Sequence, residues 1–298
     1  SKLLLFGEYG LMFDAMALSV PFSRFYGSLE FDTNGLQKDS THEIRKFFGY
    51  LSFLKENDLH YPFNLKNFKV DLEKGLCFNS NIPFQYGLGS SGALIAALFS
   101  RYAASFVEKD QLSIPSVKED LALLESYFHS KSSGLDPLVS YLNQPLLFGE
   151  DKTIQPLDFD LSKTNWSIAL IDTKTTGATG PLVQHFMECM KLPDFNTAFN
   201  SNYIPANNGC IQALLKNDSN LFFSCLEQFI AFELDNLKPM FPLDFGTLVK
   251  EALNEKVFIK LLGSGGGGFL LAFASDEQLL KQWAKRKVVQ LIWVSSIP

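Results

Sequence analysis

The sequence lacks the cysteine pairs of secreted or zinc-binding proteins and the apolar runs of membrane proteins. Its four cysteines include no C-x-x-C pair, so neither a zinc site nor a disulfide framework is expected in a chain of 298 residues. No apolar run has the length of a membrane span, and the start has no signal-peptide pattern. We therefore expect free thiols, a cytoplasmic location and no membrane partner. The cysteines are Cys77, Cys189, Cys210 and Cys225.

An excess of positive charge is also missing. The formal net charge is −6, and charges of both signs are interspersed rather than gathered in blocks. This argues against nucleic-acid binding, so any anionic ligand must be held by local donors. With 46% hydrophobic and 19% charged residues, the composition is that of a globular protein with one large or two medium domains. Because Ser1 opens in what looks like the middle of a strand, we expect a few native residues to precede it.

A loop of glycine and serine runs directly into an apolar helix near the end of the first third of the chain. The loop spans residues 87–91 with the sequence G-L-G-S-S, and residues 93–99 are alanine-rich and apolar. Gly87 and Gly89 permit positive φ, and Ser90 or Ser91 is expected to cap the helix. A helix start of this kind is suited to binding phosphate, although the lysine of a Walker A loop is missing. The alternative is a tight turn before a core helix.

A second glycine run, at residues 263–268, separates two apolar stretches that are predicted to be strands. The strands are expected at residues 258–262 and 269–274. Four successive glycines are also found in flexible linkers. Inside a domain, however, a short glycine run between strands indicates that backbone approaches something closely.

Two acidic residues attract attention in the first half of the chain. Glu125 lies on a predicted helix that begins with the capping box Ser116–Glu119 and ends near His129, four residues after Glu125. Asp136 follows in a loop rich in small polar residues. Each has a simple structural alternative, since a lone glutamate is usually exposed and an aspartate before proline can set a turn.

Strands and helices are mixed in both halves, which predicts an α+β protein. The polar stretch at residues 151–163 contains Pro156 and marks a boundary, giving predicted domains at 1–160 and 161–298. Within the first, a second capping box at Ser40 and Glu43 is expected to start a helix. The alternation of Phe68, Val70 and Leu72 predicts a strand. Residues 27–80 carry no motif and are assigned to the scaffold.

Four motifs in order resemble those of the GHMP kinase superfamily, and within it those of the mevalonate kinases most. K-L-L-L-F-G-E at residues 2–8 resembles K-[VIL]-[IL]-L-F-G-E, and residues 87–91 resemble the phosphate loop. H-S-K-S-S-G-L-D at 129–136 resembles H-G-x-P-S-G-[IV]-D, and residues 260–268 resemble K-L-T-G-A-G-G-G-G. The chain departs from the family at Tyr9, which replaces a histidine that helps to position substrate, and at Gly92, Ser132 and Ser264.

The resemblance implies an N-terminal half like ribosomal protein S5 domain 2, a ferredoxin-like C-terminal half, and ATP and substrate between them. It implies that Asp136 is the catalytic base, that Lys2 pairs with it, and that Ser91 and Glu125 hold Mg²⁺. His129 is interpreted as structural. The implied ATP-binding residues are Gly87, Leu88, Gly89, Ser90, Ser91, Gly92, Gly265 and Gly266, and the implied substrate-side residues are Glu8, Tyr9, Thr179, Gly263 and Ser264.

The implied activity is phosphorylation of mevalonate, a small-molecule partner, at its primary hydroxyl. The alternatives are another kinase of the superfamily, such as a phosphomevalonate or sugar kinase, or a protein that binds ATP without turning it over. A phosphomevalonate kinase needs extra cations, for which Arg24, Lys131 and Lys174 are the candidates. The sequence leaves the oligomeric state open, with a homodimer as one option.

Overall fold

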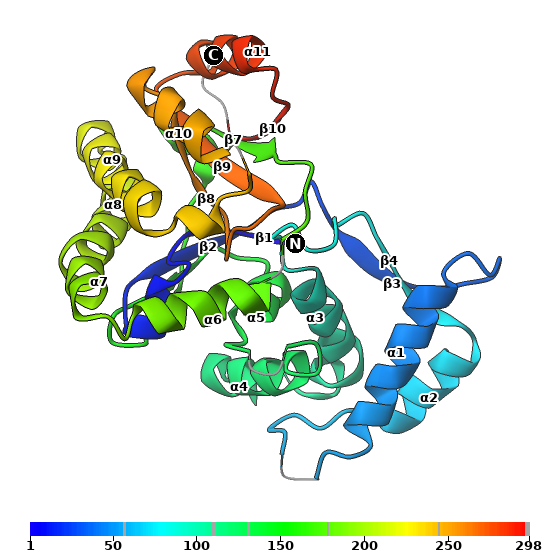
Figure 1. Ribbon diagram of the computed structural model, residues 1–298. Helices are drawn as coiled ribbons and strands as arrows, with labels where there is room; N and C mark the ends of the chain where they lie inside the picture. Colours follow the sequence, from blue (N-terminus) through cyan, green and yellow to red (C-terminus); the bar gives the residue numbers. More distant parts are fainter. Residues whose placement is uncertain (56–57, 109–110, 130–131, 178, 244, 296–298) are drawn as a thin grey trace. The chain divides into compact units, whose positions relative to one another are not determined.

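The computed structural model describes residues 1–295 except for 56–57, 109–110, 130–131, 178 and 244 (Figure 1). The described chain forms two compact units, and neither is one continuous stretch. The first unit contains Ser1–Lys2, Pro21–Pro83 and Leu88–Gln144; the second contains Leu3–Val20, Phe84–Gly87 and Pro145–Pro298. The chain therefore changes unit inside its first strand and inside the first glycine loop. The domain boundary predicted at residue 160 stays a prediction.

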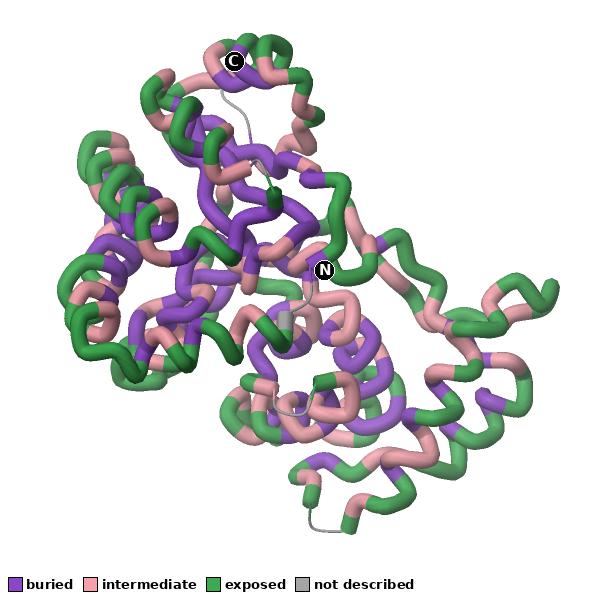
Figure 2. Tube along the Cα trace, viewed as in Figure 1, coloured by how far each residue is buried: buried purple, intermediate pink, exposed green. Residues whose placement is uncertain are grey.

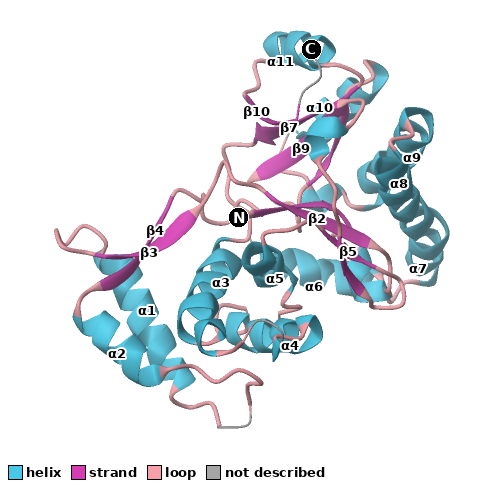
Figure 3. Ribbon diagram, turned by 180° about the vertical axis from the view of Figure 1, so that it is seen from behind, coloured by secondary structure: helices cyan, strands magenta, loops and turns pink. Residues whose placement is uncertain are grey.

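The first unit is mainly helical. Helix α3 (Ser90–Tyr102) contacts α4 (Ile114–Glu125) and α5 (Leu135–Leu142). Helices α1 (Lys38–Leu51) and α2 (Leu65–Glu73) contact one another and the antiparallel ribbon of β3 (Gly27–Phe31) and β4 (Leu76–Ser80), as seen from behind in Figure 3. A short 3₁₀ turn, η2 (Ala104–Phe106), follows α3.

The second unit contains two antiparallel sheets. One has the order β1-β2-β5-β6, formed by β1 (Lys2–Phe6), β2 (Ala17–Pro21), β5 (Leu146–Phe148) and β6 (Ile154–Pro156). The other has the order β10-β7-β9-β8, formed by β7 (Ser167–Asp172), β8 (Phe258–Leu261), β9 (Phe269–Ala274) and β10 (Leu291–Ser295). Strands β8 and β9 are buried throughout, which Figure 2 shows as continuous purple. This second sheet is therefore the centre of the unit's core.

The helices of the second unit pack on this sheet and on each other. Helix α9 (Ser219–Asn236) contacts α8 (Ile204–Lys216) and β8, α10 (Phe245–Asn254) contacts β8, and α11 (Glu277–Lys287) contacts β9. Helix α7 (Pro193–Ala198) continues through a π-helical turn (Phe199–Tyr203) into α8. The remaining elements are α6 (Thr179–Cys189), η1 (Gly10–Phe13), η4 (Leu161–Lys163) and η6 (Lys238–Met240). No described helix has the length and apolarity to cross a membrane.

The strand predicted around residue 70 is wrong, because these residues form α2. The Asn64 side chain accepts the N–H of Asn67 at 3.0 Å and so caps the helix. Phe68 and Leu72, four residues apart, are buried, whereas Val70 is 43% exposed. The burial thus follows the helical period, and the apparent alternation of a strand arose from an apolar residue on the solvent side.

The predicted helix caps are also wrong. Helix α1 begins at Lys38, and Ser40 instead exchanges hydrogen bonds with the backbone N–H and C=O of Phe78 in β4, at 2.7 and 3.2 Å. Helix α4 begins at Ile114 and ends at Glu125, so it starts before the predicted Ser116 and stops before His129. At α3 the capping position is held by Gly89 and has no side-chain cap.

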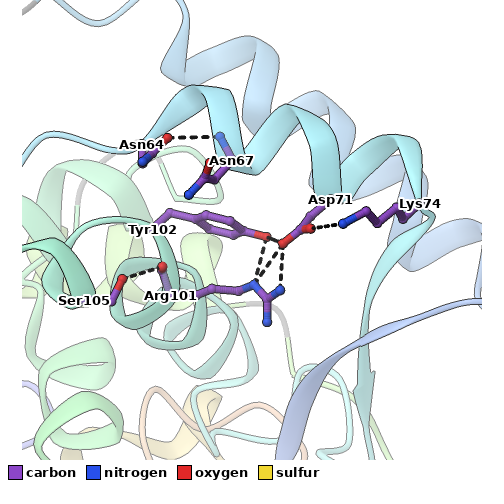
Figure 4. A network of polar contacts seen from close by, with 7 residues as sticks. All are labelled: Asn64, Asn67, Asp71, Lys74, Arg101, Tyr102 and Ser105. Carbon is purple, nitrogen blue, oxygen red and sulfur yellow. Dashed lines mark hydrogen bonds and ion pairs between the residues drawn. The ribbon is translucent and has the colours of Figure 1, made fainter.

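A buried aspartate joins α2 to α3 (Figure 4). The Asp71 carboxylate accepts hydrogen bonds from Arg101 Nη2 at 2.7 Å and from the Tyr102 hydroxyl at 2.9 Å, and Lys74 Nζ lies 3.4 Å away. Burial acts to raise the pKa of Asp71, but the hydrogen bonds from Arg101 and Tyr102 outweigh it and hold the pKa below its ordinary value. The ionised carboxylate is thus the form that fastens the two helices together.

Candidate functional site

Two helices of the first unit begin next to each other. Gly89 precedes α3 with φ of 67°, and Gly134 precedes α5 with φ of 72°, both in the left-handed region that favours glycine. A Cβ at Gly134 would lie 2.4 Å from the Lys118 carbonyl oxygen, so no other residue fits there. Helix α5 was not predicted, because its start resembles a turn.

Gly92, in the first turn of α3, is where these two helices touch. A Cβ at Gly92 would lie 2.8 Å from the Pro137 nitrogen and 3.0 Å from Asp136 Cβ. Glycine at this position, where the related motif has alanine, permits the close approach. It also places Asp136, in the first turn of α5, beside the start of α3, and a helix N-terminus stabilises a carboxylate.

Lys2 and Asp136 form an ion pair beside Gly89. Lys2 Nζ lies 3.0 Å from Asp136 Oδ1, with the lysine side chain 4% exposed and the aspartate 38% exposed. The expected pairing of these two residues is therefore present. The backbone N–H of Lys2 also donates to the Leu88 carbonyl at 3.3 Å, and a Cβ at Gly89 would lie 3.0 Å from Lys2 Cε. The first glycine loop thus passes close to the lysine stem.

Glu125, the last residue of α4, is buried within a group of small polar side chains. Its carboxylate accepts hydrogen bonds from Ser91 Oγ at 3.1 Å and from Ser132 Oγ at 2.5 Å. His129 Nε2 lies 3.1 Å from Ser91 Oγ on the exposed side. His129 therefore contacts a predicted site residue, which the sequence interpretation of it as structural did not include.

The pKa of Glu125 is raised to about 7, mainly by burial and secondly by the negative charge of Asp136. The hydrogen bonds from Ser132 and Ser91 act in the opposite direction, as does the charge of Lys2. A buried carboxylate next to a hydroxyl, with a second carboxylate nearby, is a donor set suited to a hard divalent cation such as Mg²⁺. Among the described residues, no group of three or more His, Cys, Asp or Glu is arranged to hold a metal without other ligands.

The second glycine run lies in the second unit and is threaded between other backbone segments. The N–H groups of Gly266 and Gly268 donate to the carbonyls of Met240 and Thr175, at 2.5 and 2.7 Å. A Cβ at Gly268 would lie 2.6 Å from Tyr86 Cα. The run is therefore a tightly fitted loop, which is the close approach expected from the sequence, rather than a flexible linker.

Gly87 lies in the same unit and meets the residue that precedes this glycine run. A Cβ at Gly87 would lie 3.2 Å from the Leu262 carbonyl oxygen, and one at Gly263 would lie 3.8 Å from Gly87 Cα. The first residue of the first glycine loop is thus packed on the start of the second.

The predicted substrate-side residues Glu8 and Tyr9 are both buried in the second unit. The Glu8 carboxylate pairs with Lys260 Nζ, and the two side chains are 2% and 0% exposed. The Tyr9 hydroxyl donates to the Ser264 carbonyl at 2.7 Å, and its ring stacks on Phe186 with centroids 4.3 Å apart. Burial raises the pKa of Tyr9 above its ordinary value, as do Glu233 and Glu8. Thr179 starts α6, but its side chain is outside the described residues, as are Ser130 and Lys131.

Ser132, Lys260 and Glu233 are contact residues that sequence reasoning did not assign. Ser132 and Lys260 both lie within the quoted motifs. Ser132 is a position where the chain departs from the family, and Lys260 lies in a predicted strand. The motifs could therefore have pointed to both residues. Glu233 lies in a predicted helix with nothing to distinguish it from an exposed glutamate. Only the fold shows that it is 1% exposed.

Comparison with known proteins agrees with the motifs. Residues 49–144 match the family described as GHMP kinases N terminal domain. No curated protein sequence matches the chain. These 96 residues are similar to the GHMP kinase N-terminal domain, which confirms the resemblance inferred from the sequence.

Solved structures place the whole chain in the same fold. The L. major mevalonate kinase in complex with R-mevalonate has a TM-score of 0.67 at 19% identity, covering 99% of this chain and 94% of that one. The Streptococcus pneumoniae phosphomevalonate kinase has a TM-score of 0.64 at 15% identity, covering 98% and 95%. The Streptococcus pyogenes mevalonate pyrophosphate decarboxylase has a TM-score of 0.54 at 16% identity, covering 100% and 95%. The predicted α+β GHMP kinase fold is therefore confirmed, while similarity at these identities leaves the reaction open.

Proposed function

We propose that this protein is an ATP-dependent kinase that phosphorylates the primary hydroxyl of mevalonate. The observation that carries the proposal is the ion pair of Lys2 with Asp136, held 3.0 Å apart beside Gly89 at the start of α3. Phosphoryl transfer needs a cradle for phosphate, positive charge close to it and a positioned acceptor hydroxyl. The first two requirements match features of the first unit, and a partly exposed carboxylate suits the third.

In this proposal the first glycine loop binds the triphosphate. The first N–H groups of a helix have no acceptor within the helix, and the helix dipole favours an anion there. Gly87, Leu88, Gly89, Ser90, Ser91 and Gly92 are the proposed phosphate-binding residues. Gly265 and Gly266 are proposed to approach the nucleotide from the second glycine run.

Ser91 and Glu125 are the proposed ligands of Mg²⁺. Both supply hard oxygen atoms, and they lie within 3.1 Å of each other. Mg²⁺ held by these two residues would supply positive charge that neutralises the phosphates. His129 and Ser132, through their contacts with Ser91 and Glu125, hold these two oxygen ligands in place.

Asp136 is the proposed general base. Its carboxylate accepts the proton of the acceptor hydroxyl while that oxygen bonds to the γ-phosphorus and the bond from phosphorus to the ADP oxygen breaks. Lys2 holds the Asp136 carboxylate by its ion pair and offers positive charge to the transferred group. Because Asp136 remains 38% exposed, a substrate hydroxyl can reach it, whereas Lys2 is nearly enclosed.

The substrate is the finer part of the proposal. Mevalonate is favoured by the motifs and by the structural likeness to a mevalonate kinase solved with R-mevalonate. Glu8, Tyr9, Thr179, Gly263 and Ser264 are the proposed substrate-side residues. A phosphomevalonate kinase or sugar kinase is the alternative, and a protein that binds ATP without turnover is a third.

The first test measures ADP release by the full chain with mevalonate, phosphomevalonate and a set of sugars. Turnover with mevalonate alone supports the proposal, turnover with another acceptor supports that alternative, and nucleotide binding without any turnover supports the third.

The second test replaces Asp136 by asparagine. We expect Asp136→Asn to lose at least about 10²-fold in kcat, because a general base contributes on this scale, while MgATP still binds. Asp39→Asn is the matched control, since Asp39 also lies in the first turn of a helix and is exposed. Near-normal turnover of Asp136→Asn would remove this residue as the base.

A further inference from the structure

Lys260 is a fully buried ammonium in the second unit, at 0% exposure, and it contacts no solvent. Its Nζ pairs with the Glu8 carboxylate and donates to the Leu261 carbonyl at 2.5 Å. Nζ also lies 5.4 Å from the ring centre of Phe6 and 5.7 Å from that of Phe229. Lysine is almost never enclosed in this way without partners, and removing one partner of such a pair is costly.

Glu233 hydrogen-bonds the other backbone group of Leu261. Its Oε2 accepts the N–H of Leu261 at 3.1 Å, while Lys260 takes the Leu261 carbonyl. The pKa of Glu233 is raised to about 8, mainly by burial, against the opposing charge of Lys260. Among the described strands, β8 is at the edge of its sheet, so none of them lies beside Leu261 on its outer side. The two side chains satisfy there the N–H and C=O that a further strand would satisfy.

Leu261 is the last residue of β8, and the second glycine run begins two residues later. Glu8, the partner of Lys260, is followed by Tyr9, whose hydroxyl donates to the Ser264 carbonyl inside that run. The segments 8–9 and 260–264 are thus joined at both ends, once by an ion pair and once by a hydrogen bond. Any shift of Lys260 moves the start of the glycine run.

Other backbone segments pack closely against both ends of the run. Leu262 O is 3.2 Å from where a Gly87 Cβ would stand, and Gly265 would bring a Cβ to 2.4 Å from Met240 O. Displacing the start of the run therefore disturbs Gly87 as well, which is the first residue of the proposed phosphate loop.

We propose that Lys260 is a positioning residue, which fixes the second glycine run and Gly87 for binding through Leu261 and Glu8. The inference rests on the proposed kinase function, and in it Glu8 supports the site by pairing with Lys260. Lys260 touches neither nucleotide nor substrate in this proposal, because it is enclosed by protein.

The test compares Lys260→Met with the control Lys256→Met in the full chain. Lys256 lies two residues before β8, and its side chain is 69% exposed. We expect amide hydrogen exchange of the peptide 262–268 to become at least about tenfold faster in Lys260→Met and to stay unchanged in the control. We expect the KM for the acceptor to rise about fivefold or more with a smaller change in kcat, since binding residues are misplaced.

A double variant separates positioning from a general loss of stability. Lys260→Met with Glu8→Gln removes both charges, so its melting temperature should recover towards that of the native chain. Under the proposal, exchange in 262–268 stays fast in the double variant. If exchange is unchanged in Lys260→Met, or recovers together with the melting temperature, Lys260 is only structural and the proposal is overturned.

If Lys260→Met alone does not fold, the double variant and the native chain decide the question. The readouts also separate this inference from the proposed function. Absence of ADP release by the native chain with every acceptor rejects the kinase, while the exchange comparison still decides whether Lys260 fixes the glycine run.

Discussion

At the scale of single residues, the site depends on glycines whose missing side chains let backbones approach. Gly92 is the clearest case, because a Cβ there would lie 2.8 Å from the Pro137 nitrogen in α5. Alanine is the better helix former by about 1 kcal/mol, so a substitution there gains in helix propensity and loses in packing. We therefore expect the substitution to affect the activity of the site more than the stability of the chain.

We predict that Gly92→Ala lowers kcat by about tenfold or more, because the new methyl group pushes Asp136 from its position beside α3. MgATP binding, measured by calorimetry, should change much less. Gly49→Ala is a suitable control, since a Cβ at Gly49 in α1 meets no atom within 4 Å. Equal kcat values for Gly92→Ala and the native chain would contradict the importance of this contact.

Residue patterns predicted the ion pair only by way of a family likeness. Lys2 and Asp136 are far apart in the sequence, and nothing in their spacing indicates contact. Lys260 was missed for a different reason: a lysine between apolar residues at the end of a strand reads as an exposed edge position. Its pairing with Glu8 depends on the fold of both segments, so no local pattern reports it.

At the scale of elements, the polar contacts between helices have their own pH dependence. Asp71 fastens α2 to α3, and its hydrogen bonds hold its pKa below the ordinary value. A depressed pKa contributes stability above the pKa of the unfolded chain, and this is lost as the pH falls through the folded pKa. The contribution of Asp71 is therefore present at neutral pH and disappears in acid.

We predict that Asp71→Asn lowers the free energy of unfolding by about 1–2 kcal/mol at pH 7, because charged hydrogen bonds are replaced by neutral ones. The partial exposure of Arg101 to solvent limits the size of this loss. The difference from the native chain should shrink below about pH 4. Denaturant melts at a series of pH values measure it. Asp39→Asn again serves as control, and a difference that stays constant into acid would contradict the argument.

Element prediction succeeded where burial and sequence pattern agree. The strand Phe269–Ala274 was predicted with the bounds it has, and β8 ends one residue before the predicted end at 262. It failed for α2, where Val70 faces solvent, and for α5, where Gly134 and Pro137 look like turn residues. In both cases the deciding factor was which side chains the rest of the unit covers, and this is not encoded locally.

At the scale of the whole molecule, the buried acid Glu233 should make the free energy of unfolding depend on pH. The pKa of Glu233 is raised from 4.5 to about 8, mainly by burial; the charge of Lys260 acts to lower it and that of Glu8 to raise it. A raised carboxyl pKa gives stability that is complete below the unfolded value and is lost as the pH rises through the folded one. Other titratable groups coupled to the cluster are Tyr203, Tyr9 and Cys210.

We predict that Glu233→Gln, which keeps the acceptor for the Leu261 N–H, removes a decline in stability between about pH 4.5 and 8. The decline in the native chain has a limit of about 1.4 kcal/mol per pH unit. Chemical unfolding across this range measures the difference between the two proteins. Parallel profiles for the native chain and Glu233→Gln would show that Glu233 is ionised throughout.

The placement of the indole rings has an optical consequence. All three tryptophans, Trp166, Trp283 and Trp293, belong to the second unit, and Trp166 stacks on Phe222 with centroids 4.4 Å apart. Tryptophan fluorescence, excited selectively, therefore reports on the second unit and does not report on the first unit, which contains Asp136. Far-ultraviolet circular dichroism reports on the helices of both units. Comparing the two signals during unfolding therefore shows, without any label, whether the two units melt together or in separate steps.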